Sequence, residues 1–327
     1  MTFEEAKKKF EKLFKNEMSE EEAKEFLVKL YEKGESAAEI AAAAEVMREH
    51  SIKLPVSEEL REKLIDIVGT GGDKSHSFNI SSTTALLVSS IGSYVAKHGN
   101  RSITSKSGSA DMLEALGINL NLSPENQVKM LEEVRFTFIF AINHHPAMKH
   151  IMPVRKSLSH RTIFNILGPL TNPAGAKKYL LGVFSPEFIE PVASALTLMD
   201  VKRSMVVSSL DGMDEISVAA PTKALYYDGM RLIDMEIRPD AYGMIGKKED
   251  LVGGDAKENA KITRGILNGE IKGAKRDAVL LNAAAALFVD GKVGNIEDGI
   301  EMAKEEIESK RAAKHLEKII EVSNRLS

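Results

Sequence analysis

The sequence contains no cysteine, and this absence removes several kinds of chemistry at once. Disulfide bonds, thiolate metal sites and thiol nucleophiles all require a cysteine, so none of them is available to this chain. A chain without cysteine also suits a reducing compartment, and we expect a cytoplasmic protein.

Long apolar runs and a strong charge of one sign are also missing. The longest uncharged run, Ser77 to Ala96, is rich in serine and threonine, and the more apolar run from Ala278 to Val289 is too short to span a bilayer. The amino terminus lacks an apolar signal core and is too acidic for a transit peptide. The net charge of the 327-residue chain is -4, which argues against nucleic acid as its main partner. We therefore expect a soluble protein that binds neither membrane nor nucleic acid.

The first part of the chain has the pattern of a small helical unit. Ser19 with Glu22, and Ser36 with Glu39, form capping-box signatures ahead of apolar residues at helical spacing. From Leu64 onward, short β-branched runs alternate with helical patterns, which predicts a mostly parallel sheet covered on both faces. Further extended stretches and closing helices are expected over 215–220, 223–227 and 231–237, and over 257–267, 277–289 and 296–326.

The fold class predicted from these patterns is α/β. We expect a small helical N-terminal domain over 1–64 and a larger, mostly parallel α/β domain over 65–327. The three consecutive extended stretches add a short antiparallel part to the sheet.

A glycine-rich loop follows the first predicted strand. It reads Gly69-Thr70-Gly71-Gly72-Asp73, and Asn79, Ser81 and Ser82 stand near the start of the next helix. Glycines let backbone N–H groups converge on an anion, and a helix N-terminus adds donors and a favourable dipole. Taken alone, the loop is equally compatible with an ordinary turn, and Ser81 with an ordinary N-cap.

A second loop region, from Lys97 to Asp111, combines cations and serines with glycines and leads into another helix. Alone, it is more typical of a solvated basic loop. Because the carboxyl ends of parallel strands meet at one edge of a sheet, two such loops should lie together there. The pair of loops therefore predicts a ligand with two phosphate groups.

An acidic turn, Asp211-Gly212-Met213-Asp214-Glu215, lies between two extended stretches. Magnesium ions take one or two carboxylates together with phosphate oxygens and water. Such turns are common, but beside a polyphosphate ligand we interpret this one as a metal site. Hydrolase chemistry is not indicated, because the chain has neither a metalloprotease histidine pair nor a Gly-x-Ser-x-Gly elbow.

A fourth feature is Arg155, followed by the segment from Arg161 to Pro173 with its Gly-Pro and Asn-Pro turns. An arginine can hold an organic carboxylate in a bidentate pair. From its chemistry alone, Arg155 is more typical of a surface or interface arginine.

In this order, the motifs make the sequence similar to the anthranilate phosphoribosyltransferase family. The resemblance spans nearly the whole chain, from the helical start through both loops to the acidic turn. Pyrimidine nucleoside phosphorylases share the wider fold, but the block from Phe164 to Pro173 favours the transferase. Two segments depart from the family pattern without removing a proposed ligand-binding group: Leu158-Ser159-His160 and Ser208-Ser209-Leu210.

The resemblance implies transfer of the 5-phosphoribosyl group from phosphoribosyl pyrophosphate to the amine of anthranilate, with release of pyrophosphate, in tryptophan biosynthesis. It also implies a homodimer formed through the helices, and a helical domain joined in space by about residues 155–172. The implied cofactor is Mg²⁺, held by Ser81, Asp214 and Glu215. The implied substrate contacts are Gly69, Gly72, Asp73, Ser77, Asn79, Ser81, Ser82, Lys97, His98, Gly99, Asn100, Ser105, Ser109 and Arg155.

Within this set, anthranilate is expected near Gly69, His98, Asn100 and Arg155. No strong base is expected, because the aromatic amine has a free lone pair at neutral pH. Instead, Lys97 and a metal ion at Asp214 and Glu215 are expected to stabilise the charge on the leaving pyrophosphate. The rival interpretations are a nucleoside phosphorylase on the same fold and a non-catalytic homologue that binds nucleic acid.

Overall fold

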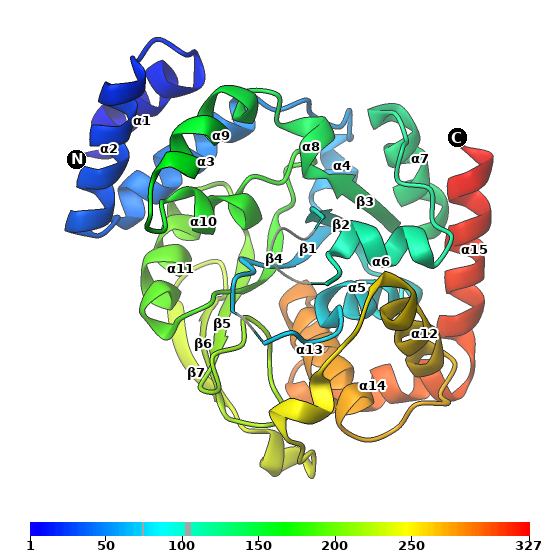
Figure 1. Cartoon of the computed structure of the whole chain (residues 1–327). Helices are drawn as coiled ribbons and strands as arrows, with labels where there is room; N and C mark the ends of the chain where they lie inside the picture. The colour runs from blue at the N-terminus through cyan, green and yellow to red at the C-terminus, as the bar shows by residue number, and fades with distance from the viewer. Residues whose placement is uncertain (74, 102–105) are drawn as a thin grey trace.

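A seven-stranded sheet forms the centre of the computed structural model, which describes residues 1–73, 75–101 and 106–327 (Figure 1). The strand order is β3-β2-β1-β4-β5-β6-β7; the pairs from β3 to β5 are parallel, and β6 and β7 join in antiparallel pairs. The predicted α/β class is confirmed, with its mostly parallel sheet and short antiparallel addition. The strands are β1 (Leu64–Gly69), β2 (Tyr94–Gly99), β3 (Phe136–Phe140), β4 (Lys178–Gly182), β5 (Arg203–Ser209), β6 (Thr222–Tyr227) and β7 (Leu232–Ile237).

The order of the strands creates a switch point at the middle of the sheet. The chain passes from β1 to β2 and β3 on one side, and then crosses back to place β4 on the other side of β1. Loops that leave adjacent strands in opposite directions open a crevice at the carboxyl ends of those strands. The first glycine loop starts at this point, directly after β1.

Helices cover the sheet on two sides, and each side has its own apolar core. Side chains alternate between the faces along a strand, so Ile65 and Ile67 enter one core while Leu64 and Val68 enter the other. The first core is shared with α5 (Ile80–Ser90), α6 (Ser109–Ala115), α7 (Pro124–Val134), α12 (Ala256–Leu267), α13 (Ala274–Asp290), α14 (Ile296–Glu308) and α15 (Arg311–Arg325).

The second core is shared with the N-terminal helices and with helices from the middle of the chain. Phe14 of α1 lies 6.1 Å from Phe164 of α10, measured between ring centroids, so the 148–167 region packs against the helical start. The helices on this side are α1 (Phe3–Phe14), α2 (Glu20–Lys33), α3 (Ala37–Glu49), α4 (Glu58–Arg61), α9 (Met148–Ser157), α10 (Phe164–Leu167) and α11 (Ile189–Leu198). The remaining short elements are α8 (Ala141–His144), η1 (Gly168–Leu170), η2 (Pro186–Phe188), η3 (Pro239–Tyr242) and η4 (Lys248–Leu251).

Two predicted elements were wrong in detail. The stretch 215–220 is not a strand, because the side chain of Asn282 bonds both backbone groups of Ile216 and takes the place of a strand partner. The predicted helix over 296–326 is two helices, and it breaks at Lys310, whose φ of 64° lies in the left-handed region. In the part of the chain that the structure describes, no helix has the length and apolar character needed to cross a bilayer.

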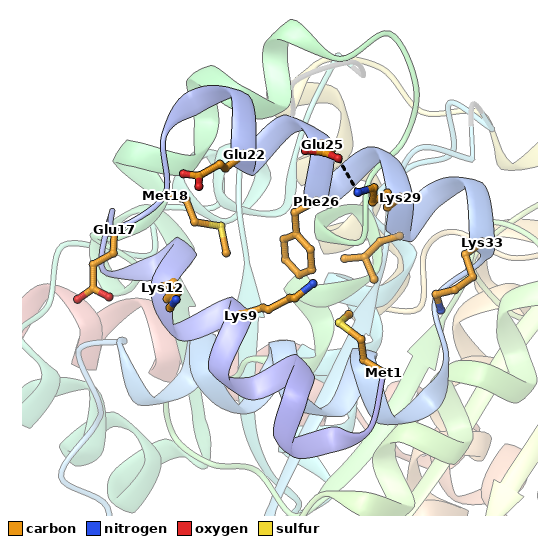
Figure 2. A pocket seen from close by; sticks show the side chains of 11 residues that line it. Met1, Lys9, Lys12, Glu17, Met18, Glu22, Glu25, Phe26, Lys29 and Lys33 are labelled. Carbon is orange, nitrogen blue, oxygen red and sulfur yellow. Dashed lines mark hydrogen bonds and ion pairs between the residues drawn. The ribbon is translucent and has the colours of Figure 1, made fainter.

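A hollow of about 440 Å³ lies between α1 and α2 (Figure 2). Met18, Phe26 and Leu30 are among the apolar residues that line it, and the other lining residues include lysines and glutamates. None of the lining residues belongs to the site predicted from the sequence.

The start of α3 depends on the fully buried carboxylate of Glu39. It accepts hydrogen bonds from the amino group of Met1 at 3.0 Å, from Lys33 Nζ at 2.7 Å, and from the backbone N–H and hydroxyl of Ser36 at 2.9 and 3.0 Å. Burial alone would raise the pKa of Glu39, but these donors outweigh it and lower the pKa to about 2.

We expect Glu39→Gln to reduce the free energy of unfolding by about 1–2 kcal/mol at pH 7, because Lys33 and the amino terminus keep contact with water. Folding lowers this pKa, so the contribution is complete above the unfolded value of 4.5 and is lost as the pH falls towards 2. Urea unfolding at several pH values should show a constant difference in the free energy of unfolding between wild type and Glu39→Gln above about pH 5.5, and a smaller difference below it. A difference that does not change with pH would contradict this account.

Candidate active site

Both predicted phosphate loops leave the carboxyl edge of the sheet and touch each other. β1 and β2 are neighbours, and the loops that follow them meet where Asn79 Nδ2 donates to the carbonyl of Ser107 at 3.3 Å. Asn259 of α12 donates in turn to Asn79 Oδ1 at 2.9 Å. The described parts of the two loops therefore form one wall at the edge of the sheet.

The acidic turn closes this edge against the first loop. Asp214 Oδ2 accepts the backbone N–H of Gly71 at 2.6 Å, and Glu215 Oε1 accepts the backbone N–H of Ser81 at 3.2 Å. Gly71 and Gly72 have φ values of 68° and 77°, a region that favours glycine. The three residues predicted to hold Mg²⁺, namely Ser81, Asp214 and Glu215, thus lie together.

Two glycines make this approach sterically feasible. A Cβ on Gly182, the last residue of β4, would overlap the backbone carbonyl of Asp214, and a Cβ on Gly69 would overlap the Asp214 carboxylate. Any side chain at either position would have to displace the acidic turn.

Lys97 is the cation at the centre of these groups. It is buried, and its Nζ donates to the carbonyl of Ile67 at 2.5 Å and to Ser81 Oγ at 3.2 Å. Burial lowers the pKa of Lys97, while the carboxylates of Asp66, Glu215 and Asp214 oppose the shift. An ammonium has three N–H donors, so one remains for a substrate oxygen.

The carboxylates beside Lys97 are unfavourably charged without a further cation. Burial raises the pKa of Asp214 well above its usual value, and the neighbouring carboxylates of Asp73 and Glu215 raise it further. Burial raises the pKa of Glu215 to about 7, against the attraction of Lys97. Asp73 Oδ2 is buried and has no hydrogen-bond partner within the described ranges.

These oxygen donors fit Mg²⁺. Across residues 1–73, 75–101 and 106–327, no group of three or more acidic or histidine side chains forms a metal cage of its own. Magnesium does not require one, since it commonly binds one or two carboxylates and takes its other ligands from substrate phosphates and water.

The start of α5 does not match the interpretation of Ser81 as an ordinary N-cap. Asn79, not Ser81, occupies the N-cap position, and its side chain makes no capping bond because it is used by Ser107 and Asn259. The interpretation of Ser81 as an ordinary N-cap is therefore wrong. The hydroxyl of Ser82, in the same first turn, is buried without a partner in the described structure.

The other predicted phosphate contacts lie along the same wall. Ser77 pairs with Val252 in an isolated bridge, and Ser109 is the first residue of α6. Asn100 follows Gly99 at the end of β2, and its carbonyl accepts the N–H of Ala110. Ser105 lies outside the described residues.

One of the predicted anthranilate contacts, His98, faces the 148–170 region. His98 is buried, with Nδ1 donating to the carbonyl of Gly168 at 3.0 Å and Nε2 facing His145 Nε2 at 3.2 Å. The carbonyl can only accept, which fixes the tautomer of His98. Burial, and then the neighbouring His145, hold the pKa of His98 well below its usual value, so the ring is neutral at pH 7.

Arg155 comes from α9 and is half-buried. Its guanidinium lies 5.3 Å from the centre of the Phe164 ring, and it forms no ion pair with a carboxylate of any described residue. Burial lowers its pKa, with no acidic neighbour to offset the effect. A half-buried guanidinium of this kind suits a carboxylate supplied by a ligand.

Sequence reasoning missed several residues around the site. Arg161 donates to the carbonyl of Gly72 at 3.0 Å, and its guanidinium lies 3.6 Å from the centre of the Phe184 ring. In the sequence, Arg161 stands out only as the first residue of a motif. In the two segments that depart from the family pattern, His160 stacks on Tyr31 of α2, and Leu210 is exposed.

Asp66 and Asn172 were also missed. The signal for Asp66 was present, since a carboxylate stands in the middle of an otherwise apolar parallel strand. No comparable signal marks Asn172, because its partners are distant in the sequence.

Comparison with known proteins shows the family of this chain. The chain matches the models of two domains: the α/β domain of a glycosyl transferase family over residues 61–313, and the helical bundle domain of a glycosyl transferase family over 1–51. The anthranilate phosphoribosyltransferase of Methanobrevibacter smithii is 50% identical over 315 residues, which cover 96% of this chain and 92% of the relative. The chain belongs to the anthranilate phosphoribosyltransferase family.

Other family members give the same result. The anthranilate phosphoribosyltransferase of Lachnoclostridium phytofermentans is 46% identical, covering 99% of this chain and 96% of the relative. The crystal structure of the Thermus thermophilus enzyme superposes with a TM-score of 0.93 at 42% identity, covering 99% of this chain and 96% of that one. The Saccharomyces cerevisiae enzyme, solved in complex with PRPP and Mg, has a TM-score of 0.85 at 29% identity, with coverage of 94% and 86%.

We expect Gly182→Ala to reduce the free energy of unfolding by about 1–3 kcal/mol, because the added methyl group overlaps the backbone of the acidic turn. Thermal and urea unfolding measure this effect. The matched control is Gly294→Ala, where an added Cβ meets open space and the backbone is not in the left-handed region. Equal stability of both variants would show that the turn does not need this close approach.

Proposed function

We propose that this chain transfers the 5-phosphoribosyl group of phosphoribosyl pyrophosphate to the amine of anthranilate and releases pyrophosphate, a step of tryptophan biosynthesis. The observation that carries the proposal is that the first anion-binding loop is joined to the acidic turn, through Gly71 with Asp214 and Ser81 with Glu215. The same loop is joined to the second anion-binding loop through Asn79 with Ser107. A ligand that carries two phosphate groups and binds Mg²⁺ matches this combination.

Phosphoribosyl pyrophosphate would bind along the wall formed by the two loops. Glycine backbone N–H groups and the first turn of α5 offer hydrogen-bond donors to its phosphate oxygens. The residues we propose for these contacts are Gly69, Gly72, Asp73, Ser77, Asn79, Ser81, Ser82, Lys97, Gly99, Asn100 and Ser109, together with Ser105 from outside the described residues.

Ser81, Asp214 and Glu215 would hold Mg²⁺ in this site. When bound, the ion supplies positive charge close to the pyrophosphate oxygens. The resemblance of this chain to the S. cerevisiae enzyme solved with PRPP and Mg supports the choice of metal. The acidic pair supports the choice of residues, since a cation would offset the mutual repulsion of the two carboxylates.

Lys97 would stabilise the leaving group directly. As the bond between ribose C1 and the pyrophosphate oxygen breaks, negative charge grows on that oxygen and the ribose gains oxocarbenium character. The ammonium of Lys97 is held in place by Ile67 and Ser81 before the reaction starts. A charge that is already oriented costs little reorganisation in the transition state.

Anthranilate would bind on the other side of C1, near Gly69, His98, Asn100 and Arg155. The guanidinium of Arg155 would pair with the carboxylate of anthranilate, and the neutral ring of His98 would pack beside it. The amine has a free lone pair at neutral pH, so orientation contributes more than proton removal.

We also propose a helical domain over 1–64, joined by about residues 155–172, an α/β domain over 65–327, and a homodimer formed through the helices. The packing of Phe14 against Phe164 supports the first of these, because it ties the two separated segments into one apolar core.

The function is tested by following the fluorescence of anthranilate in the presence of phosphoribosyl pyrophosphate and Mg²⁺. We expect the fluorescence to disappear only when all three components are present with the protein. Phosphorolysis of thymidine or uridine with inorganic phosphate should be undetectable. Phosphorolysis without consumption of anthranilate would overturn the proposal in favour of a nucleoside phosphorylase.

We expect Asp214→Asn combined with Glu215→Gln to lower kcat by about 100-fold or more, because the charge that holds the metal is removed. Steady-state kinetics at saturating Mg²⁺ measure this, and thermal melting checks that the variant is folded. A folded variant with near-normal kcat would refute the metal assignment.

We expect Arg155→Ala to raise the KM for anthranilate by about 10- to 150-fold, which corresponds to the loss of a charge-assisted contact of about 1.5–3 kcal/mol. The KM for phosphoribosyl pyrophosphate should change little. Arg155→Lys should restore only part of the affinity, since an ammonium lacks the planar fork of a guanidinium.

The matched control for Arg155 is Lys156→Ala, which removes an exposed cation at the next position of α9. It should leave both KM values unchanged. A parallel rise of both KM values in Arg155→Ala would assign this arginine to the packing of α9 rather than to the substrate.

A further inference from the structure

The pairing between β1 and β2 stops early. These strands are in register at only two positions, Leu64 with Tyr94 and Ile65 with Val95. On the other side of β1, the pairing with β4 continues from Ile65 to Gly69. The regular ladder between β1 and β2 therefore ends before their carboxyl ends, which is where the proposed substrates bind. The backbone groups beyond the end of the ladder need other partners, because buried N–H and C=O groups are almost always paired.

Side chains supply those partners. The backbone N–H of His98 donates to Asp66 Oδ1 at 3.1 Å, and the carbonyl of Ala96 accepts from Asn172 Nδ2 at 2.8 Å. The carbonyl of Ile67 accepts from Lys97 Nζ. Three side chains thus take over the hydrogen bonding of the missing ladder between the two strands.

Asp66 and Asn172 bind the backbone beyond the end of the ladder as a unit, which we call the Asp66–Asn172 pair. Asn172 Nδ2 donates to Asp66 Oδ2 at 2.8 Å, and Asn172 Oδ1 accepts the N–H of Ala174 at 2.9 Å. Both residues have an exposed fraction of 0%. Each polar atom of the two side chains is used, so small changes in either residue leave a buried group without a partner.

The pair determines the position of the two proposed substrate contacts on β2. His98 follows Lys97 directly, so their side chains point to opposite faces of the sheet. His98 points to the proposed anthranilate side, and Lys97 points to the proposed phosphate side. Because the regular ladder has ended at Val95, the bonds from His98 and Ala96 to the pair fix the distance of this segment from β1.

We propose that Asp66 and Asn172 are positioning residues for the transfer: they hold the end of β2 that lies beyond its ladder with β1, so that Lys97 and His98 face the reacting groups. The inference rests on the proposed function, and neither residue touches a substrate in it. The pair is also linked to the 164–173 segment, because Asn172 belongs to that segment and Gly168 within it binds the ring of His98.

The test uses Asp66→Asn, which keeps the shape of the side chain. The carboxylate oxygen that accepts from Asn172 Nδ2 becomes an NH2 group, so that a donor faces a donor. We expect kcat to fall by about 10- to 100-fold, since misplacement of reacting groups by about 1 Å has effects of this size. The KM for anthranilate should rise, while the KM for phosphoribosyl pyrophosphate should stay within about threefold, because the first glycine loop is untouched.

The control is Asp290→Asn at the opposite end of the sheet. Asp290 is also a buried carboxylate that joins two strands, accepting from Ser93 Oγ at 2.6 Å, just before β2, and from Lys178 Nζ at 2.7 Å, at the start of β4. This variant should lower the melting temperature and leave kcat and both KM values within about twofold. A similar loss of kcat in both variants, or a kcat within about twofold of wild type in Asp66→Asn, would overturn the positioning role.

Asn172→Ala keeps the proposal testable if Asp66→Asn does not fold. It should reproduce the kinetic pattern, and adding Asp66→Asn to it should have little further effect, because the two residues act as a unit. Independent, additive effects of the two substitutions on kcat would contradict the proposal that Asp66 and Asn172 act as a unit.

Amide hydrogen exchange without substrates separates this inference from the proposed function. In both variants, the segment 94–100 should exchange faster than in wild type, while 178–182 in β4 should be unchanged. If the wild-type protein does not consume anthranilate, the proposed function fails, but the exchange result still tests the pair. Unchanged exchange over 94–100 would refute it whatever the activity.

Discussion

Asp214 and Glu215 lie in a partly buried turn that packs against the carboxyl ends of β1 and β4, and the arrangement of the whole site follows from that contact. Glycine at positions 69 and 182 leaves room for the turn, and the N–H groups of Gly71 and Ser81 bind its carboxylates. One contact therefore sets the position of the first phosphate loop, the start of α5 and the acidic groups. The switch point in the strand order explains why this happens at the middle of the sheet and not at its edge.

Burial of this turn is electrostatically costly. The pKa of Glu215 is raised to about 7, and burial and the surrounding carboxylates raise the pKa of Asp214 well above its usual value. Lys97 offsets part of the negative charge from within the protein. A divalent cation and its bound substrate would offset the rest, so the same groups that destabilise the empty site favour binding of a metal–polyphosphate complex.

Local patterns predicted most of the fold and the composition of the site, because strands, loops and capping boxes depend on neighbouring residues. Contacts between distant residues could not be predicted in this way. The hydrogen bonds from Asn282 to Ile216 take the place of the strand pairing that the sequence pattern predicts. The side chain of Asn79 bonds Ser107 and therefore makes no capping bond. The partnership of Asp66 with Asn172 is of the same kind, since it joins residues 106 positions apart in the sequence.

The central claim is that a metal–phosphoribosyl pyrophosphate complex binds at the acidic turn. The most direct measurement is anomalous diffraction from crystals grown with phosphoribosyl pyrophosphate and Mn²⁺, which shares the preference of Mg²⁺ for oxygen ligands. The account predicts an anomalous peak within coordination distance of Ser81, Asp214 or Glu215, with the pyrophosphate along the two loops. Pyrophosphate density and a manganese peak at another part of the protein, with none at this turn, would contradict it.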